Sequence, residues 1–285
     1  MRLTVDSEKC TLCGACLTTC PSDMVRRRED HIKIGHVACI ECGHCLAICP
    51  TGAIVAEDPV ALDPIDPALP SPASLKRLIR TRRTVRRYRP DPVPAPLIED
   101  LLDSARWAPT AANGQAQEYV IVTASDTKDE LRQRIEAYYR AFAEALADRE
   151  NRAVRLVALG LDPQAAAHPH VLAAVPAFVK SVDSGRDRLF FEAPAIIIVH
   201  AAEDRVMPEA ACAFATLSLV LMAEAHGLGT CLTGFASDAL RTRAEIREWL
   251  GIPPGNQVHA VVALGWPAEE FVRVPERKPL RAEWR

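Results

Sequence analysis

The sequence predicts a chain of two parts: a small cysteine-rich domain, and a larger domain of α/β character in which helices and strands alternate. Two runs of four cysteines share one spacing and lie within the first 50 residues. A stretch with five prolines between Pro59 and Pro72 follows, and it is incompatible with continuous helix. Beyond it, helical periodicity alternates with short β-branched runs. We therefore expect domains at residues 1–57 and 74–285, joined by a proline-rich linker at residues 58–73.

Length and composition limit the functional classes. The 285 residues are 49% hydrophobic, which is enough to bury a full core, and a net charge of −3 excludes a globally basic nucleic-acid-binding protein. The N-terminus lacks the apolar core of a signal peptide, and no window approaches the uninterrupted apolar length of a bilayer span. We therefore expect a cytoplasmic protein with neither a nucleic-acid nor a membrane partner.

The cysteine runs read "CTLCGACLTTCP" and "CIECGHCLAICP", and each cysteine of the first recurs 29 residues later in the second. In a reducing compartment such clustering indicates metal ligation rather than disulfides. Thiolates suit zinc, copper(I), or iron with sulfide. Two structural zinc knuckles are one interpretation, but they leave the duplicated spacing of three cysteines plus one without a reason.

Over residues 1–57 this pattern resembles a bacterial-type ferredoxin with two iron–sulfur clusters. The resemblance implies relay of single electrons and no substrate chemistry of its own. It also implies crossed ligation, in which the last cysteine of each run binds the other run's cluster. Gly14 and Gly43 would let the backbone pass close to a cluster. The implied ligands are Cys10, Cys13, Cys16 and Cys49 for one [4Fe–4S] cluster, and Cys20, Cys39, Cys42 and Cys45 for the other.

In the larger domain, periodicity predicts an amphipathic helix around residues 97–105. Strands are expected at "EYVIVTA", "PAIIIVHAA" and "HAVVALGW", each covered on both faces because polar alternation is weak. Residues 129–161 form a predicted helical region, followed by a less regular stretch to residue 191. Residues 208–226 are nearly all apolar and predict a buried helix that ends at Gly227.

An arginine-rich segment, "RTRRTVRRYRP", opens the larger domain with six arginines between Arg80 and Arg89. A solvated basic helix or a nucleic-acid-binding patch is one interpretation. The hydroxyl of Thr84 and the forked guanidinium groups favour a phosphate site instead. Downstream, "WAPTAANGQ" combines small residues with the amides of Asn113 and Gln115, which could approach a flat ring or simply form a helix-ending turn.

These motifs, together with "GLGTCLTGF", "ALGWP" and "PERKPL" in this order, resemble the FMN-dependent nitroreductase family over residues 74–285. The resemblance implies an α+β fold, a mixed sheet flanked by helices, and a homodimer with the flavin at the interface. Several aromatic residues lie in the segment that covers the active site in related enzymes, although core or interface packing explains each of them better than a catalytic role. These residues are Tyr138, Tyr139, Phe142, Phe190 and Phe191. The implied FMN-binding residues are Arg82, Arg83, Thr84, Arg86, Pro109, Thr110, Asn113, Gln115, Thr233, Gly234, Arg277 and Lys278.

Thr233 departs from the family pattern, because many members have an acidic residue there. The flavin would convert single electrons into two-electron chemistry, so no side-chain nucleophile is required and no catalytic side chain is assigned. We expect an oxidoreductase that relays electrons from the clusters to FMN and reduces a nitroaromatic, a quinone or a similar small acceptor. The donor could be NAD(P)H, a ferredoxin or another electron-donor protein. Alternatives are reductive dehalogenation, enoyl or ring reduction, or a non-catalytic electron-transfer or redox-sensing module.

Overall fold

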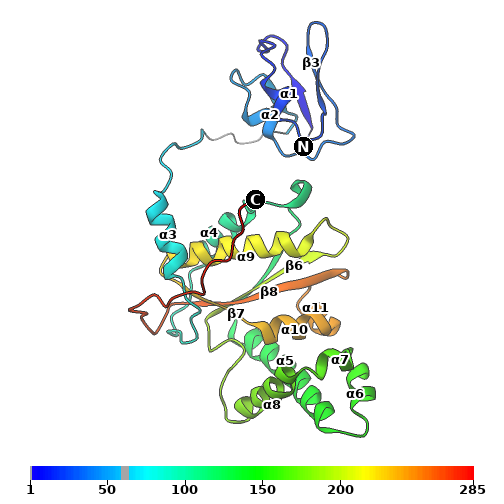
Figure 1. Ribbon diagram of the computed structural model, residues 1–285, viewed down its shortest axis with the longest axis vertical. Coiled ribbons are helices and arrows are strands. Elements are labelled where there is room, and N and C mark those ends of the chain that lie inside the picture. The colour runs from blue at the N-terminus through cyan, green and yellow to red at the C-terminus, as the bar shows by residue number, and fades with distance from the viewer. Residues whose placement is uncertain (1, 59–63) are drawn as a thin grey trace. The chain divides into compact units, whose positions relative to one another are not determined.

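The computed structural model describes residues 2–58 and 64–285, so the middle of the predicted linker lies outside the described residues. The chain divides into two compact units. The first comprises residues 1–70 and the short segment 110–114; the second comprises residues 71–109 and 115–285 (Figure 1). The second unit therefore begins at Ser71, which caps helix α3 (Pro72–Thr81) by accepting a hydrogen bond from the Ser74 amide.

The first unit contains two short antiparallel strand pairs and two helical turns. Strand β1 (Leu3–Val5) pairs with β4 (Ile54–Ala56), and β2 (Val25–Arg27) pairs with β3 (Ile32–Ile34), both antiparallel. The helices α1 (Ala15–Thr19) and α2 (His44–Ala47) each begin after a glycine whose φ is near +75°, at Gly14 and Gly43. The glycines therefore serve the left-handed turn that opens each helix.

The second unit is built on a four-stranded sheet in the order β5-β6-β8-β7. Neighbouring strands are antiparallel, and the parallel pairing is an isolated bridge between Thr84 and Thr230. Alternate residues of β6 face two separate cores: Ile196 and Ile198 point to one, and Ile197 and Val199 to the other. The strands are β5 (Glu118–Val122), β6 (Ala195–Ala202), β7 (Gly229–Leu232) and β8 (Asn256–Gly265).

Helices cover both faces of this sheet (Figure 1). Helices α4 (Ala95–Arg106) and α9 (Pro208–Ala225) pack on one face. Helices α5 (Ser125–Ala147), α8 (Pro169–Asp183) and α10 (Gly234–Thr242) pack on the other. The prediction that all three strands are covered on both faces holds only in part for β5, which is an edge strand. Its Tyr119 and Val120 pack against the two cores, but Ile121 is exposed. The remaining short helices are η1 (Ala111–Asn113), α6 (Arg152–Ala158), α7 (Pro163–Ala166) and α11 (Ala244–Trp249).

Two helix predictions need correction. The helical region predicted at residues 129–161 is two helices, because Asp148 leaves helical geometry and its carboxylate accepts the Asn151 amide at 3.0 Å. The stretch predicted to be irregular contains α8. Its Pro169 occupies the first turn, where a proline loses no hydrogen bond, and the His168 ring nitrogen accepts the His170 amide at 3.2 Å.

The apolar helix predicted at residues 208–226 is confirmed as α9. It ends just before Gly227, whose φ is +73°. Its length and composition would also allow it to cross a membrane, so the expectation that no segment reaches this length is wrong. The helix instead contacts α4, β6 and β8, and burial in this core accounts for its apolar sequence. Phe214 and Leu217 remain about half exposed on its other face.

Candidate functional site

The first unit gathers the eight clustered cysteines around two small cavities. One cavity is lined by three cysteines of the first run and the last cysteine of the second; the other has the reverse composition. The structure thus groups the thiols in the same two sets that crossed ligation requires. The sets are Cys10, Cys13, Cys16 and Cys49 around one cavity, and Cys20, Cys39, Cys42 and Cys45 around the other.

The crossing cysteines are stabilised as thiolates by backbone amides. The Met24 amide donates to Cys20 Sγ at 3.3 Å, and the Ala53 amide donates to Cys49 Sγ at 3.2 Å. Burial acts to raise the pKa of both thiols, but the hydrogen bonds outweigh it and the net direction is downward. The thiolate is the form that ligates iron, so these two positions are suited to bind it.

The arginine-rich segment continues past α3 as extended chain held against the sheet. The Val85 amide donates to the Thr230 carbonyl at 2.9 Å, and the Tyr88 hydroxyl lies 2.8 Å from the Val85 carbonyl and 3.2 Å from the Ala263 carbonyl. Gly229 lets the segment approach, since a Cβ on it would lie 2.6 Å from Val85 Cγ2. These contacts fix the backbone on both sides of Arg86 and directly after Thr84.

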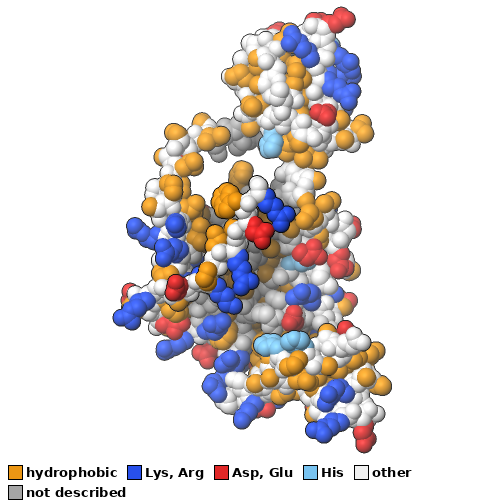
Figure 2. All heavy atoms as spheres, viewed as in Figure 1, with side chains coloured by type: hydrophobic (Ala, Val, Ile, Leu, Met, Phe, Trp, Pro, Cys, Tyr) orange, Lys and Arg blue, Asp and Glu red, His pale blue; other side chains and the backbone are white. Residues whose placement is uncertain are grey.

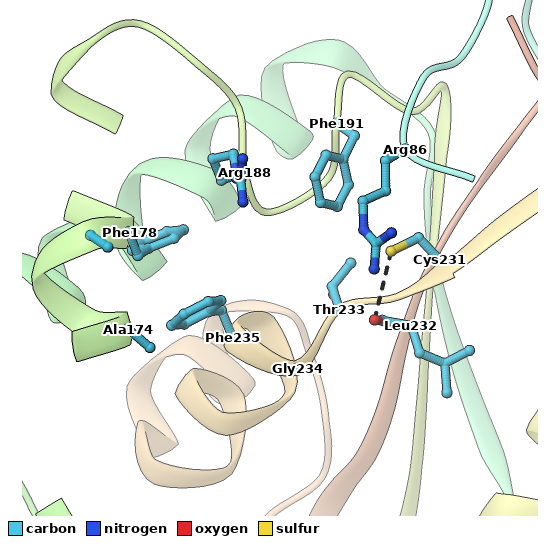
Figure 3. Close-up of a pocket in the computed structure, with 11 residues that line it drawn as sticks. Arg86, Ala174, Phe178, Arg188, Phe191, Cys231, Leu232, Thr233, Gly234 and Phe235 are labelled. Atoms are coloured by element: carbon cyan, nitrogen blue, oxygen red, sulfur yellow. Dashed lines mark hydrogen bonds between the residues drawn. The ribbon is translucent and has the colours of Figure 1, made fainter. Parts of the chain in front are cut away.

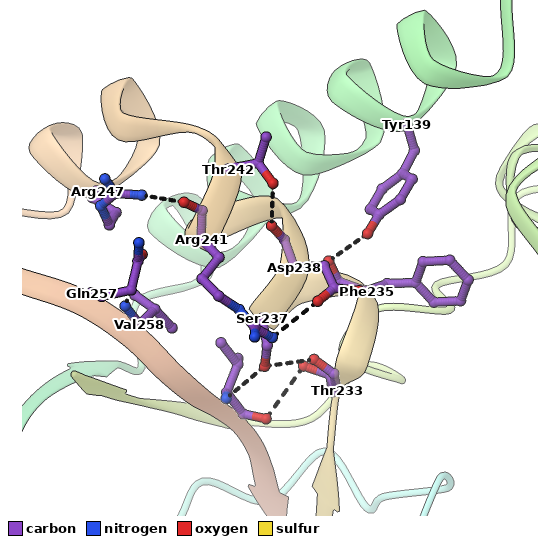
Figure 4. Close-up of polar contacts among 11 residues, drawn as sticks. Tyr139, Thr233, Phe235, Ser237, Asp238, Arg241, Thr242, Arg247, Gln257 and Val258 are labelled. Atoms are coloured by element: carbon purple, nitrogen blue, oxygen red, sulfur yellow. Dashed lines mark hydrogen bonds and ion pairs between the residues drawn. The ribbon is translucent and has the colours of Figure 1, made fainter. Parts of the chain in front are cut away.

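The turn at Thr233 joins β7 to α10 and is tied to β8 (Figure 4). The Thr233 amide donates to the Val261 carbonyl at 2.9 Å. The Ser237 hydroxyl donates to the Thr233 carbonyl at 3.0 Å and accepts the Val261 amide at 3.1 Å. The Tyr139 hydroxyl also holds the turn, by donating to the Phe235 carbonyl at 2.9 Å. The start of α10 is therefore rigidly placed.

A cavity of about 350 Å³ lies where the arginine segment, the Thr233 turn and the chain before β6 meet (Figure 3). Arg86 reaches into it from one side and Arg188 from another, as Figure 3 shows. The Phe178 and Phe235 rings stack at 4.6 Å between centroids and form an apolar wall. The complete lining is Arg86, Ala174, Ala177, Phe178, Arg188, Phe191, Cys231, Leu232, Thr233, Gly234 and Phe235.

Arg86 is oriented by its neighbours in this cavity. Its guanidinium carbon lies 5.9 Å from the centroid of the Phe191 ring, within reach of a cation–π contact. It also contacts Cys231. Burial raises the pKa of the Cys231 thiol more than the nearby Arg86 lowers it, so this cysteine is a neutral, buried thiol.

A second cavity of about 590 Å³ adjoins the first and shares Ala174, Gly234 and Phe235 with it. Helices α5, α8 and α10 enclose it, and Tyr138, Tyr139 and Phe142 line one side. Tyr138 and Tyr139, which the sequence placed in a segment covering an active site, are core residues with less than a tenth of their surface exposed.

The structure brings only part of the predicted flavin set to the first cavity. Arg86, Thr233 and Gly234 line it. Arg82 instead interacts with Glu224 of α9, whose pKa is raised by burial and partly lowered by that arginine. Arg83 Nη1 donates to the Arg82 carbonyl at 2.7 Å, while its Nε is buried without a hydrogen-bond partner among the described residues.

The other predicted residues lie elsewhere. The Asn113 side-chain amide donates to the carbonyls of Ile40 and Glu41 within the first unit, at 3.3 and 3.1 Å. Its segment also holds Thr110 and is flanked by Pro109 and Gln115 of the second unit. Arg277 and Lys278 are exposed in the C-terminal segment, which has neither helix nor strand.

Sequence reasoning missed several residues of the cavity. Arg188 lies in "RDRLFF", and Phe235 directly follows the recognised turn. No spacing rule connects Arg188 with Arg86 because about a hundred residues separate them. The available signal in the sequence is that Arg188 lies next to the Phe190–Phe191 pair.

Comparison with known families supports both parts of the chain. The model of the nitroreductase family matches residues 79–266, and the model of a 4Fe-4S dicluster domain matches residues 2–50. The predicted fusion of a two-cluster module with a nitroreductase-like domain is therefore confirmed.

Curated relatives point the same way. A protein named NADH dehydrogenase from Thermus thermophilus is 32% identical over 194 residues, which cover 66% of this chain and 84% of the relative. The chloronitrobenzene nitroreductase of Comamonas testosteroni is 27% identical over 234 residues, which cover 75% of this chain and 96% of the relative.

Solved structures show the same fold. A nitroreductase with bound FMN from Desulfitobacterium hafniense aligns with a TM-score of 0.52 and 21% identity, covering 73% of this chain and 98% of that one. A BluB-like flavoprotein from Clostridium difficile aligns with a TM-score of 0.54 and 18% identity, covering 72% of this chain and 94% of that one. The predicted α+β fold of the larger domain is thus confirmed.

Proposed function

Because the chain belongs to the nitroreductase family, we propose that it is a flavin oxidoreductase in which single electrons pass from two [4Fe–4S] clusters to FMN and on to a small organic acceptor. Nitroaromatics and quinones are the acceptor classes that fit best. The observation that carries the proposal is the presence, in one chain, of two crossed thiol sets and a cation-lined aromatic cavity.

The cavity and the arginine segment fit a flavin nucleotide. The buried Arg83 Nε lacks a partner among the described residues, and a phosphate oxygen would satisfy it. Arg86, which lines the cavity, would provide a cation for bound FMN, whose reduced ring is anionic. When bound, FMN supplies the conversion between one-electron and two-electron chemistry.

The chain's own residues would position the acceptor and limit water. The Phe178 and Phe235 stack presents a flat apolar wall suited to a ring. Two-electron reduction of a nitro group also consumes two protons and releases water. The cavity lining contains no carboxylate among the described residues, and the Cys231 thiol is neutral and faces Arg86, so we assign proton delivery to solvent.

We further propose a homodimer, as the family resemblance implies. Apolar side chains are exposed on α9, at Phe214 and Leu217, and along the C-terminal segment, where Leu280 and Trp284 are more than nine-tenths exposed. Figure 2 shows hydrophobic side chains on this face of the second unit. A second copy that covers them would remove this apolar surface from water.

The proposal is tested first by composition. Protein purified without oxygen should contain about eight irons and about one FMN per chain, given two four-iron clusters and one flavin site. Zinc in place of iron, or a second unit that retains no flavin, would exclude the proposal.

The relay is tested by the electron donor. A reduced ferredoxin should support turnover of a nitroaromatic by the wild type and not by Cys49→Ser, which lacks one cluster, whereas both proteins should still bind FMN. An Arg26→Ala variant, altered at an exposed residue of β2, is a matched control in the same unit. Equal turnover by Cys49→Ser and the wild type would show that electrons bypass the clusters.

A further inference from the structure

The positive charge of the first cavity is not balanced by a carboxylate in its described lining. Its described lining includes two arginines, Arg86 and Arg188, and no aspartate or glutamate. Two cations that converge on an apolar cavity repel one another unless their ligands bring negative charge. Arg86 is already accounted for by its contacts with Cys231 and Phe191 and by the proposed flavin. Arg188 therefore needs a separate explanation.

Arg188 has no hydrogen-bond or ion-pair partner among the described residues. The adjacent carboxylate, Asp187, is occupied elsewhere, because its oxygens accept the amides of Leu189, Phe190 and Glu192 at 2.8 to 2.9 Å. This network fixes the loop just past Arg188. The guanidinium is exposed and extends into the cavity from a fixed backbone (Figure 3). It is therefore available to a ligand.

The surroundings of Arg188 select the shape of that ligand. Across the cavity lie the Phe178 and Phe235 stack and the small Ala174 and Ala177, which leave room for a flat ring. A planar guanidinium binds a carboxylate through two parallel hydrogen bonds, and this preference is stronger where apolar walls exclude water. The adjoining cavity of about 590 Å³, which shares Ala174, Gly234 and Phe235 with the first, adds room for such a ring.

We propose that Arg188 anchors the carboxylate of an aromatic acceptor, so that the preferred substrates are aromatic acids bearing a reducible group. This inference rests on the proposed function, because it names the substrate class of the same site. Arg188 is then a specificity residue for the acceptor, whereas Arg86 serves the flavin.

The first experiment measures binding without turnover. Benzoate, which has no reducible group, and benzamide, its neutral analogue, are titrated against the oxidised holoenzyme while the visible flavin absorption is followed. Benzoate should bind more tightly than benzamide. In Arg188→Gln the Kd of benzoate should rise about 10- to 100-fold, the loss expected for a hydrogen bond to a charged group, while that of benzamide changes less than about twofold.

Two variants serve as comparisons. Arg186→Gln alters an exposed arginine two residues away that donates to Ser184 and does not line the cavity, so benzoate affinity should be unchanged. Arg188→Lys keeps the charge and loses the fork, so it should retain part of the affinity. Flavin content is measured for each variant and should equal that of the wild type.

The second experiment compares the anaerobic reduction of 4-nitrobenzoate and 4-nitrobenzamide with a reduced ferredoxin as donor. Arg188→Gln should raise KM for the acid about 10- to 100-fold with little change in kcat, and it should leave the amide unaffected. Equal effects on both compounds, loss of FMN, a change of oligomeric state, or no effect at all would overturn the proposal. If neither compound is reduced but benzoate binding still depends on Arg188, the proposed function fails and the carboxylate site stands.

Discussion

A methyl group added at Gly229 should push the arginine-rich segment away from β7, and both of these line the proposed site. In Gly229→Ala the new Cβ would lie 2.6, 2.7 and 2.9 Å from Val85 Cγ2, Cβ and Cγ1. Ordinary carbon contacts need about 3.5–4.0 Å. Val85 cannot simply move away from residue 229, because its amide is hydrogen-bonded to the carbonyl of the next residue, Thr230.

The cost follows from these contacts. Overpacking of a well-packed core costs about 1–3 kcal/mol, and loss of the Val85 hydrogen bond adds about 1 kcal/mol. Gly229 has no positive φ, so alanine introduces no backbone strain. We expect Gly229→Ala to lower the free energy of unfolding of the second unit by about 2–4 kcal/mol. Displacement of Val85 also moves Arg86, so FMN should dissociate more readily while iron content is unchanged.

Urea denaturation followed by tryptophan fluorescence is the assay, because all four tryptophans lie in the second unit. Val85→Ala removes two of the three close contacts, so the double variant should be less destabilised than the sum of the single variants. Gly229→Ala with wild-type stability and flavin content would refute the reasoning. Additive single effects would show that the clash with Val85 is not the cause.

Further predictions concern the clusters, the flavin and the buried polar groups. Cys20→Ser and Cys49→Ser should each lose about half of the iron, measured with an iron chelator, and keep FMN; loss of flavin in either would contradict the separation of the sites. Arg83→Ala should lower FMN occupancy in the visible spectrum and spare the iron, and unchanged occupancy would remove the phosphate assignment. Stability should fall as the pH drops through about 6.5, because burial lowers the folded pKa of His200 and the unfolded chain then binds the proton more readily. In His200→Asn that dependence, measured by denaturation at pH 5 and pH 7, should weaken; a slope equal to that of the wild type would assign it to other groups.

The acid sensitivity of His200 has a structural basis. Its Nδ1 lies 2.9 Å from the Asn256 side-chain amide, which also donates to Glu118 at 3.0 Å. Nδ1 must therefore accept, and a proton there would break the hydrogen bond. The sign follows, since a group whose folded pKa is lowered destabilises the fold as it protonates.

The cluster-binding part of the chain could be interpreted almost entirely from the sequence. Each run puts three cysteines on one short loop, and the resemblance to a two-cluster ferredoxin implies that the fourth binds the other run's cluster. The structure adds the closure of the second loop onto the first, which places Cys49 with Cys10. The helices of the second unit were less predictable, because the Asp148 side chain and the first-turn position of Pro169 decide where α5 ends and α8 begins.

The family and the cofactors were readable in the sequence because they depend on short motifs whose chemistry is local, such as the arginine run and the Thr233 turn. The substrate side of the cavity was not, because Arg86, Arg188 and Phe235 come from three distant segments that only the packing of the sheet and helices brings together. Whether an arginine lacks a partner, as Arg188 does within residues 2–58 and 64–285, depends on where every neighbouring carboxylate points, and only the tertiary structure decides that.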